Sequence, residues 1–270
     1  MTFKSVLKVI IHLLIAVFLT IITQIGGILY LISLLLISNK KPNYKLKRVF
    51  LFIAIYLVST FLVVPKVAPI FGRVKIENNS KIEAHNFVTK LFNRNYITPK
   101  MQLVLSDVSL KLNKEFPHIK VIYLDANFPF INGFPLLPHL SHNDGKKIDI
   151  SFIYQDKKGK TTNLKPSNSG YGIFVAPTKK EINQTNVCIK RGFWQYGFTK
   201  YLNFGSFNTD LKLSEKATQK LIFKIIENHK VSKLFIEPHL KSRLKLNNSK
   251  IRFHGCRAVR HDDHIHFQIN

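Results

Sequence analysis

The chain of 270 residues has room for one catalytic domain of ordinary size and a smaller additional part. Its 41 Lys and Arg against 15 Asp and Glu give a formal net charge of +26, which favours anionic surroundings such as lipid headgroups, acidic cell-wall polymers or nucleic acid. Lysine is abundant throughout, so the charge is equally compatible with general composition. The spacing of Cys188 and Cys256 excludes a cysteine zinc site; they form either a disulfide in an oxidising compartment or two buried thiols.

The first apolar run, residues 9–38, predicts membrane insertion. At ~1.5 Å per residue it is longer than one bilayer core of about 30 Å requires, yet too short for two comfortable spans. It is either one long tilted helix or a tight pair broken at Gly26 and Gly27. A cleaved signal peptide is the competing interpretation, but its apolar region has about 7–15 residues and a small-residue cleavage site, which this run lacks.

A polar loop at residues 39–48 precedes a second apolar run, residues 49–64. The loop carries the cations Lys40, Lys41, Lys45, Lys47 and Arg48. The positive-inside rule places this loop in the cytoplasm, so the helix after it carries the chain outward. We therefore predict a membrane anchor of two or three apolar helical segments over residues 1–65, and a domain on the outer face of the membrane over residues 66–270.

After a linker at residues 65–72, rich in proline and glycine, hydrophobic spacing predicts an α+β fold. The predicted helices cover residues 80–93, 99–116, a segment that opens at Ser214, and 240–246. The predicted strands cover residues 121–128, 148–154, 233–237 and 264–269. We predict long loops over residues 156–208, of the kind that often form the walls of a site.

Five of the eleven histidines fall in two short stretches, and the first stretch is followed by a carboxylate. His139 and His142 precede Asp149, Gly145 allows a turn between them, and Asp149 enters a predicted strand. A loop histidine and a strand carboxylate can therefore converge on one metal ion. The remaining histidines have no comparable partners, and we predict structural or surface roles for His12, His85, His118, His229, His239 and His254.

The second stretch contains His261, His264 and His266 at the end of the chain. Alternate side chains of a strand share a face, so His264 and His266 lie side by side while the intervening residues fill the other face. One of the pair can bind a metal while the other faces a metal-bound water. Two histidines and one aspartate leave a coordination position open, as in catalytic zinc sites, where the bound water has a pKa of about 7. Either motif alone is more often a solvated or core feature, and only their joint occurrence indicates a site.

The pattern SHxxGxxxD at residues 141–149, followed far downstream by HxH at residues 264–266, resembles the signature of the LAS metallopeptidases. This group is named for lysostaphin-type, D-Ala-D-Ala and sonic hedgehog proteins. His139 and His261, each three residues before a motif histidine, make the chain most similar to penicillin-insensitive murein endopeptidases. The resemblance covers the chain from about residue 134 to its end, and it implies a small antiparallel sheet with flanking helices and long loops.

The resemblance implies that His142, Asp149 and His266 bind Zn²⁺. The sequence departs from the pattern at Lys147, where related D-Ala-D-Ala enzymes commonly have a small residue. This departure bears on substrate detail more than on metal binding.

The resemblance also implies roles for the remaining histidines of the two stretches. His264 would be the general base or would orient the attacking water, and His261 would assist by stabilising the charged intermediate. His139 would support the site from its edge. The implied protein is a membrane-anchored zinc endopeptidase that hydrolyses an amide bond in the cross-links or stem peptides of peptidoglycan.

This activity would place the anchor in the inner (cytoplasmic) membrane and the catalytic domain in the periplasm or on the outer face. The alternative is a zinc-containing cell-wall-binding module of the same fold without hydrolytic activity. Nucleic-acid binding has no motif in this sequence and conflicts with the outward topology.

Overall fold

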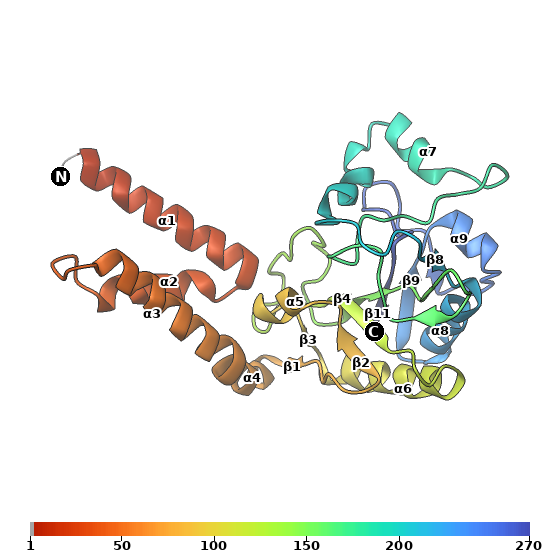
Figure 1. Cartoon of the computed structure of the whole chain (residues 1–270), viewed down its shortest axis with the longest axis horizontal. Helices are drawn as coiled ribbons and strands as arrows, with labels where there is room; N and C mark the ends of the chain where they lie inside the picture. The colour runs from red at the N-terminus through yellow and green to blue at the C-terminus, as the bar shows by residue number, and fades with distance from the viewer. Residues whose placement is uncertain (1–2) are drawn as a thin grey trace. The chain divides into compact units, whose positions relative to one another are not determined.

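The structure is a computed structural model that describes residues 3–270. It is a mixed α/β fold with small sheets, and the chain forms two compact units (Figure 1). The first unit contains the N-terminal helices, and the second contains the largest sheet and the C-terminus.

The first apolar run is a pair of helices, α1 (Phe3–Thr23) and α2 (Gly26–Leu36). The chain reverses at Gln24, which has a left-handed φ of 67°. A Cβ atom on Gly27 would lie 2.2 Å from the carbonyl oxygen of Ala16, so glycine lets α2 approach the backbone of α1. The structure therefore favours the tight pair over the single tilted helix.

The second apolar run forms α3 (Tyr44–Val58), a π-helical turn η1 (Ser59–Val63), α4 (Val64–Val67) and a 3₁₀ turn η2 (Ala68–Phe71). The prediction of a linker at residues 65–72 was wrong, because the chain stays helical to Phe71. Pro65 lies in the first turn of α4, where a missing N–H is tolerated, and the left-handed Gly72 ends the helix.

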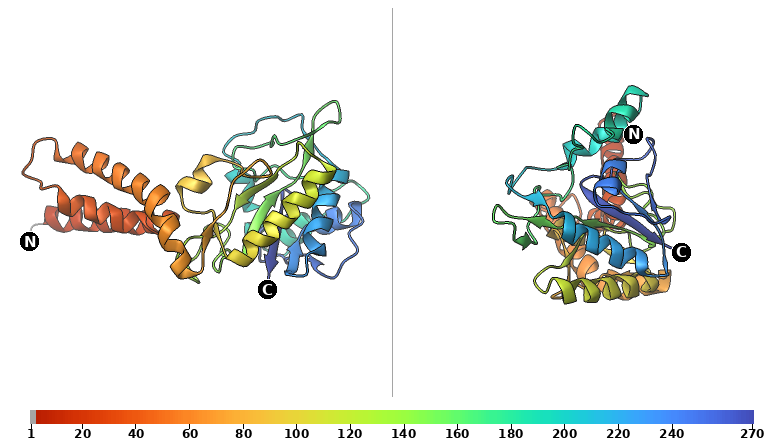
Figure 2. Two further views of the ribbon diagram at one scale, coloured as in Figure 1. Left: turned by 90° about the horizontal axis from the view of Figure 1, so that it is seen from below. Right: turned by 90° about the vertical axis from the view of Figure 1, so that its right-hand side faces the viewer.

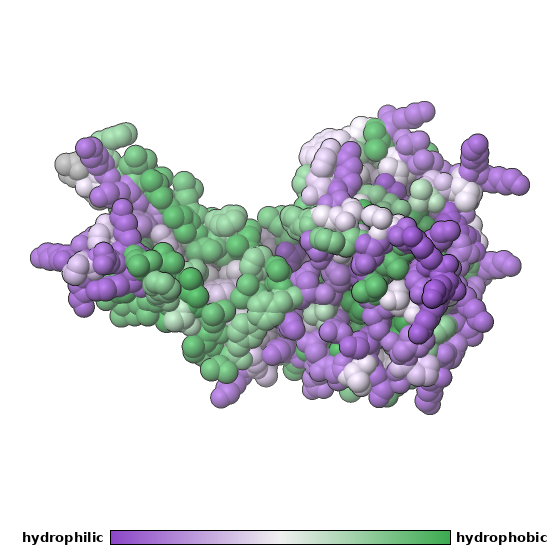
Figure 3. Space-filling model, in the orientation of Figure 1, coloured by the Kyte–Doolittle hydropathy of each residue, from purple (hydrophilic) through white to green (hydrophobic). Residues whose placement is uncertain are grey.

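Among residues 3–270, two helices are long and apolar enough to cross a membrane, Phe3–Thr23 and Tyr44–Phe71. In the most apolar 18-residue window of each helix, only 11% and 17% of the residues are buried within the chain, whereas a core helix of a soluble protein is mostly buried. Hydrophobic residues accordingly cover much of the visible surface of these helices (Figure 3). Their length, composition and exposure suggest membrane association.

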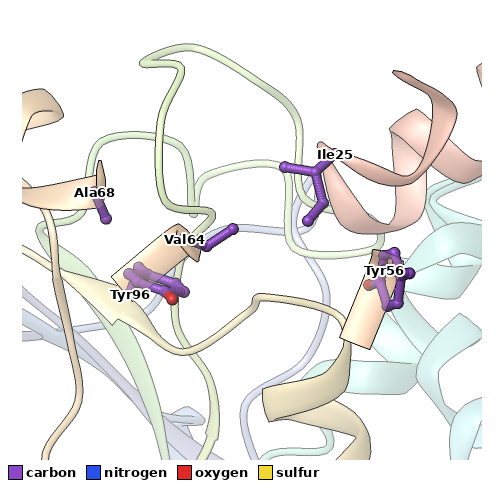
Figure 4. Close-up of a cluster of buried hydrophobic side chains, with 5 residues drawn as sticks. All are labelled: Ile25, Tyr56, Val64, Ala68 and Tyr96. Atoms are coloured by element: carbon purple, nitrogen blue, oxygen red, sulfur yellow. The ribbon is translucent and has the colours of Figure 1, made fainter. Parts of the chain in front are cut away.

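Inside the first unit, the helices enclose a small cluster of buried side chains (Figure 4). Its members come from the turn before α2, from α3, α4 and η2, and from strand β3 (Tyr96–Ile97), and they are Ile25, Tyr56, Val64, Ala68 and Tyr96. The Tyr56 hydroxyl donates a hydrogen bond of 2.7 Å to the carbonyl oxygen of Leu91 in α5 (Phe87–Leu91). The apolar helices are thus packed against residues 88–99 of the same unit.

The second unit is organised on a six-stranded sheet in the order β10-β9-β11-β5-β4-β2. Its strands are β10 (Ile251–Arg252), β9 (Val231–Phe235), β11 (His264–Ile269), β5 (Lys147–Ser151), β4 (Val121–Asp125) and β2 (Ile82–Ala84). The centre is antiparallel as expected, but the edge pairs β10-β9 and β2-β4 are parallel, so the sheet is mixed.

The second unit also contains a three-stranded sheet, in which β6 (Tyr154–Gln155) lies between β7 (Thr161–Thr162) and β8 (Lys212–Leu213). In the first unit, β1 (Val74–Lys75) pairs with β3.

Two long helices, α6 (Pro99–Glu115) and α8 (Glu215–Glu227), lie side by side against the large sheet (Figure 2). Lys224 Nζ of α8 is 2.8 Å from Glu115 Oε1 of α6, and the apolar side of α8 is buried. A short helix, α9 (Pro238–Arg243), follows β9. These helices and the C-terminal strand agree with the sequence prediction.

The prediction of a helix over residues 80–93 was wrong, because the chain there forms β2 and the short helix α5. The side chain of Asn79 accepts a hydrogen bond from the Ile82 backbone N–H at 3.0 Å, which makes a turn where the helix was predicted to begin. Ile82 and Ala84 are buried and Glu83 is exposed, which is the alternation of a strand.

The predicted loops over residues 156–208 contain helix α7 (Gln184–Lys190) and a 3₁₀ segment η3 (Trp194–Leu202). Cys188 of α7 forms a disulfide with Cys256, which decides between the two alternatives left open by the sequence. The bond fastens α7 to the segment that precedes His261.

Lys165 is buried in the second unit and provides a test of the packing. Its Nζ donates a hydrogen bond of 3.0 Å to the Phe152 carbonyl oxygen, and burial lowers its pKa from 10.5 to about 7. Because the folded pKa is the lower one, the unfolded chain binds the extra proton between pH 7 and 10.5, and stability increases as pH rises through this window.

We expect Lys165→Met to raise stability at pH 7 by on the order of a few kcal/mol, with the gain shrinking towards pH 10. Thermal unfolding followed by circular dichroism from pH 7 to 10 measures this difference. Lys160→Met, at an exposed position nearby, should show no such pH-dependent gain. A constant offset between Lys165→Met and the parent at all pH values would contradict the titration.

Candidate metal centre

The site is built on two neighbouring strands, β11 and β5. Their antiparallel register places His266 opposite Asp149 and His264 opposite Ser151. Residues directly opposite each other share a face, so His264, His266 and Asp149 lie on one side of the sheet, and Ile265 and Phe267 lie in the core on the other. The sequence predicted that His264 and His266 lie on one face, because alternate side chains of a strand point to the same side of the sheet.

Asp149 is fully buried and is contacted from several directions. Its Oδ1 lies 2.9 Å from His266 Nδ1, and its Oδ2 accepts a hydrogen bond of 2.9 Å from the Tyr171 hydroxyl. His264 Nε2 lies 3.8 Å from the same Oδ2. A carboxylate without water around it needs such partners, because an isolated buried charge is costly.

His264 is oriented by Asp263, the residue immediately before β11. Asp263 Oδ1 is 2.5 Å from His264 Nδ1, and Asp263 Oδ2 accepts a hydrogen bond of 2.6 Å from the Gly172 backbone N–H. A carboxylate only accepts hydrogen bonds, so Nδ1 carries the ring proton. Nε2, which is directed towards Asp149, is then the basic nitrogen of His264.

Within residues 3–270, two groups of buried side chains could hold a metal ion. One consists of His139, Asp149 and His264, and the other of His142, Asp149 and His266. In each group, one ligand atom per residue lies within 4.8 Å of the others. The second group is the set that the resemblance assigns to the metal. Imidazole nitrogens with a carboxylate oxygen form a donor set that suits a first-row transition metal, so the residues fit the implied ion.

His261 lies beside the two strand histidines, with its ring centre 4.9 Å from that of His264 and 5.7 Å from that of His266. Burial, followed by the neighbouring histidines, lowers its pKa well below 6.5. His261 is therefore neutral near pH 7 rather than a cation.

A carboxylate behind His261 holds its backbone. Glu237 follows β9, and its Oε1 accepts hydrogen bonds from the Tyr196 hydroxyl (2.6 Å) and the His261 N–H (3.0 Å). Burial raises the pKa of Glu237 to about 7. The sequence did not indicate a role for Glu237, and its contacts show a supporting position behind the histidines.

Sequence reasoning also missed His254 and Tyr171. The His254 ring stacks on Phe235 at 4.1 Å, and its centre is 5.2 Å from that of His261. The Tyr171 ring packs edge-on against His264 at 5.0 Å. No regular spacing connects either residue to the motifs. Two sequence features could have pointed to them. Tyr171 lies in the loops that were predicted to form the walls of a site, and His254 lies two residues before Cys256.

No protein-family model and no curated protein matches this chain. The donor atoms, the burial and the hydrogen bonds of the site define its chemistry.

Proposed function

We propose that the chain is a metal-dependent hydrolase of amide bonds. More specifically, we propose a membrane-anchored zinc endopeptidase that cleaves the peptide part of peptidoglycan. The observation that carries the proposal is the buried group His142, Asp149 and His266, with His264 held by Asp263 at its edge.

Zinc is the ion that this donor set favours. Two histidines and one aspartate are a three-ligand set typical of catalytic zinc, whereas structural zinc sites usually use four protein ligands. Bound there, Zn²⁺ supplies a Lewis acid that polarises a carbonyl and lowers the pKa of water.

The protein residues supply positioning and proton transfer. His264 accepts a proton at Nε2, because its Nδ1–H is committed to Asp263. Tyr171 holds Asp149 in place through the 2.9 Å hydrogen bond to Oδ2. Neutral His261 can donate a hydrogen bond to negative charge that develops on the substrate.

The substrate class is supported by the resemblance and by the topology inferred from charge and hydropathy. The resemblance connects the two motifs to murein endopeptidases, and the positive-inside rule puts the domain on the outer face of the membrane. The net charge of +26 suits an anionic wall. The motifs, the topology and the charge all favour peptidoglycan peptides as the substrate.

The test uses the full chain, purified in a mild detergent. We expect about one zinc per chain by elemental mass spectrometry and new product peptides when cross-linked muropeptides are digested. Full activity in metal-free protein would exclude the zinc mechanism. Retention of intact peptidoglycan without any product would instead indicate the non-catalytic wall-binding module.

A further inference from the structure

A cavity of about 400 Å³ lies among α1, α2 and α3, far along the chain from the metal-binding residues. Its lining includes the basic side chains of Lys8 from α1 and Lys45 and Arg48 from α3. The loop between α2 and α3 contributes Asn39. This is the end of the helices that the positive-inside rule assigns to the cytoplasm.

The charge at this end of the helices is unbalanced within the sequence. Residues 1–48 contain seven Lys and Arg, residues 1–76 contain no Asp or Glu, and none of the residues that line the cavity is acidic. Cations at membrane depth are costly unless they pair with an anion, with backbone carbonyls or with lipid headgroups. An anion from outside the chain can therefore serve as the counter-charge for the two lysines, because this part of the sequence supplies none.

Arg48 is already fixed at the cavity. Its Nη2 donates to the carbonyl oxygens of Leu34 (2.9 Å) and Ile37 (2.7 Å) at the end of α2, and its guanidinium carbon lies 5.3 Å from the centre of the Tyr44 ring. These contacts hold one positive charge in a constant place. Lys8 and Lys45, whose side chains are exposed, can close on a ligand beside it.

The rest of the lining is divided between polar and apolar groups. His12 Nδ1 of α1 and the Tyr30 hydroxyl of α2 are 2.6 Å apart and form a polar floor. Leu34, Val49 and Phe52 form an apolar wall. A basic rim with an apolar wall fits a molecule that joins a phosphate to a hydrocarbon chain, and basic pockets between transmembrane helices bind anionic headgroups.

We propose that this cavity binds the phosphate headgroup of an anionic phospholipid, with the acyl chain along the apolar wall. The proposal rests on the membrane association of the helices and is independent of the peptidase activity. A bound lipid would join α1, α2 and α3 at the end where like charges otherwise repel.

Native mass spectrometry of the full chain in a neutral detergent tests the proposal. The probes are phosphatidylglycerol, which is anionic, phosphatidylcholine, which is zwitterionic, and inorganic phosphate. We expect one retained phosphatidylglycerol per chain, bound about tenfold or more tightly than phosphatidylcholine, and no comparable adduct of inorganic phosphate. Equal binding of the two lipids would overturn the proposal, and so would phosphate alone binding as tightly as the anionic lipid.

Two matched double variants distinguish lipid binding in the cavity from a general attraction between the lipid and the positive charge of the protein. Lys8→Gln with Lys45→Gln should weaken phosphatidylglycerol binding by about 25-fold, since one lysine near a membrane surface is worth roughly fivefold. Lys40→Gln with Lys41→Gln removes the same charge from the loop outside the cavity lining and should have a much smaller effect. An equal loss in both pairs would show that the lipid responds to overall charge only.

Helical content by circular dichroism checks that the variants fold. Leu34→Phe keeps every charge and fills part of the apolar wall, so it should also weaken lipid binding. Unchanged binding in this variant would contradict an acyl chain in the cavity. His266→Ala should leave lipid binding unchanged, so failure of the peptidase proposal and failure of the lipid proposal can be told apart.

Discussion

Replacing His266 by alanine should remove both the bound zinc and the peptidase activity. His266 offers a ligand atom within 4.8 Å of those of His142 and Asp149, and two remaining ligands hold zinc poorly. We expect zinc affinity to fall by more than about 100-fold, because even outer-shell partners of a ligand cost 10–100-fold when removed. Zinc content after dialysis and turnover of cross-linked muropeptides measure the two losses.

His229→Ala is the matched control, because it removes an exposed histidine by the same substitution and should preserve zinc and turnover. If His266→Ala kept its zinc, the ligand assignment would be wrong. The other group of buried side chains, His139, Asp149 and His264, would then be the alternative, and His139→Ala would remove the metal instead.

The strand positions of the site could be predicted from the sequence, because they follow from local periodicity. Alternation alone put His264 and His266 on one face, and the apolar residues around Asp149 placed it in a strand. The direct pairing of His266 with Asp149 required the strand order β11-β5, which joins segments more than a hundred residues apart in sequence. No spacing pattern contains that information.

The supporting residues could not be predicted, because irregular segments position them. Tyr171 and Gly172 reach Asp149 and Asp263 from a loop, and neither contact follows a period. Asp263 precedes β11, so strand alternation does not describe its side chain. The sequence also did not predict that the helix continues to Phe71. Proline usually ends a helix, but Pro65 lies in the first turn of α4, where proline is tolerated.

Replacing His264 by alanine should slow hydrolysis roughly 10²–10⁴-fold, the range for loss of a general acid–base group, while most of the zinc remains. In the proposed assignment His264 is not a ligand; its basic Nε2 faces Asp149 Oδ2 across 3.8 Å. The measurements are kcat on muropeptides and zinc content of the same preparation. Wild-type turnover in this variant would exclude His264 as the base.

Asp263→Asn tests whether Asp263 acts through His264. An asparagine can present its NH₂ group to Nδ1, which moves the ring proton to Nε2 and removes the basic nitrogen from the site. We expect a smaller loss of kcat than in His264→Ala, an altered pH profile and normal zinc. The double variant should be no slower than His264→Ala alone, because residues that act as a unit are not additive. An additive loss would show that Asp263 stabilises the loop at Gly172 independently of His264.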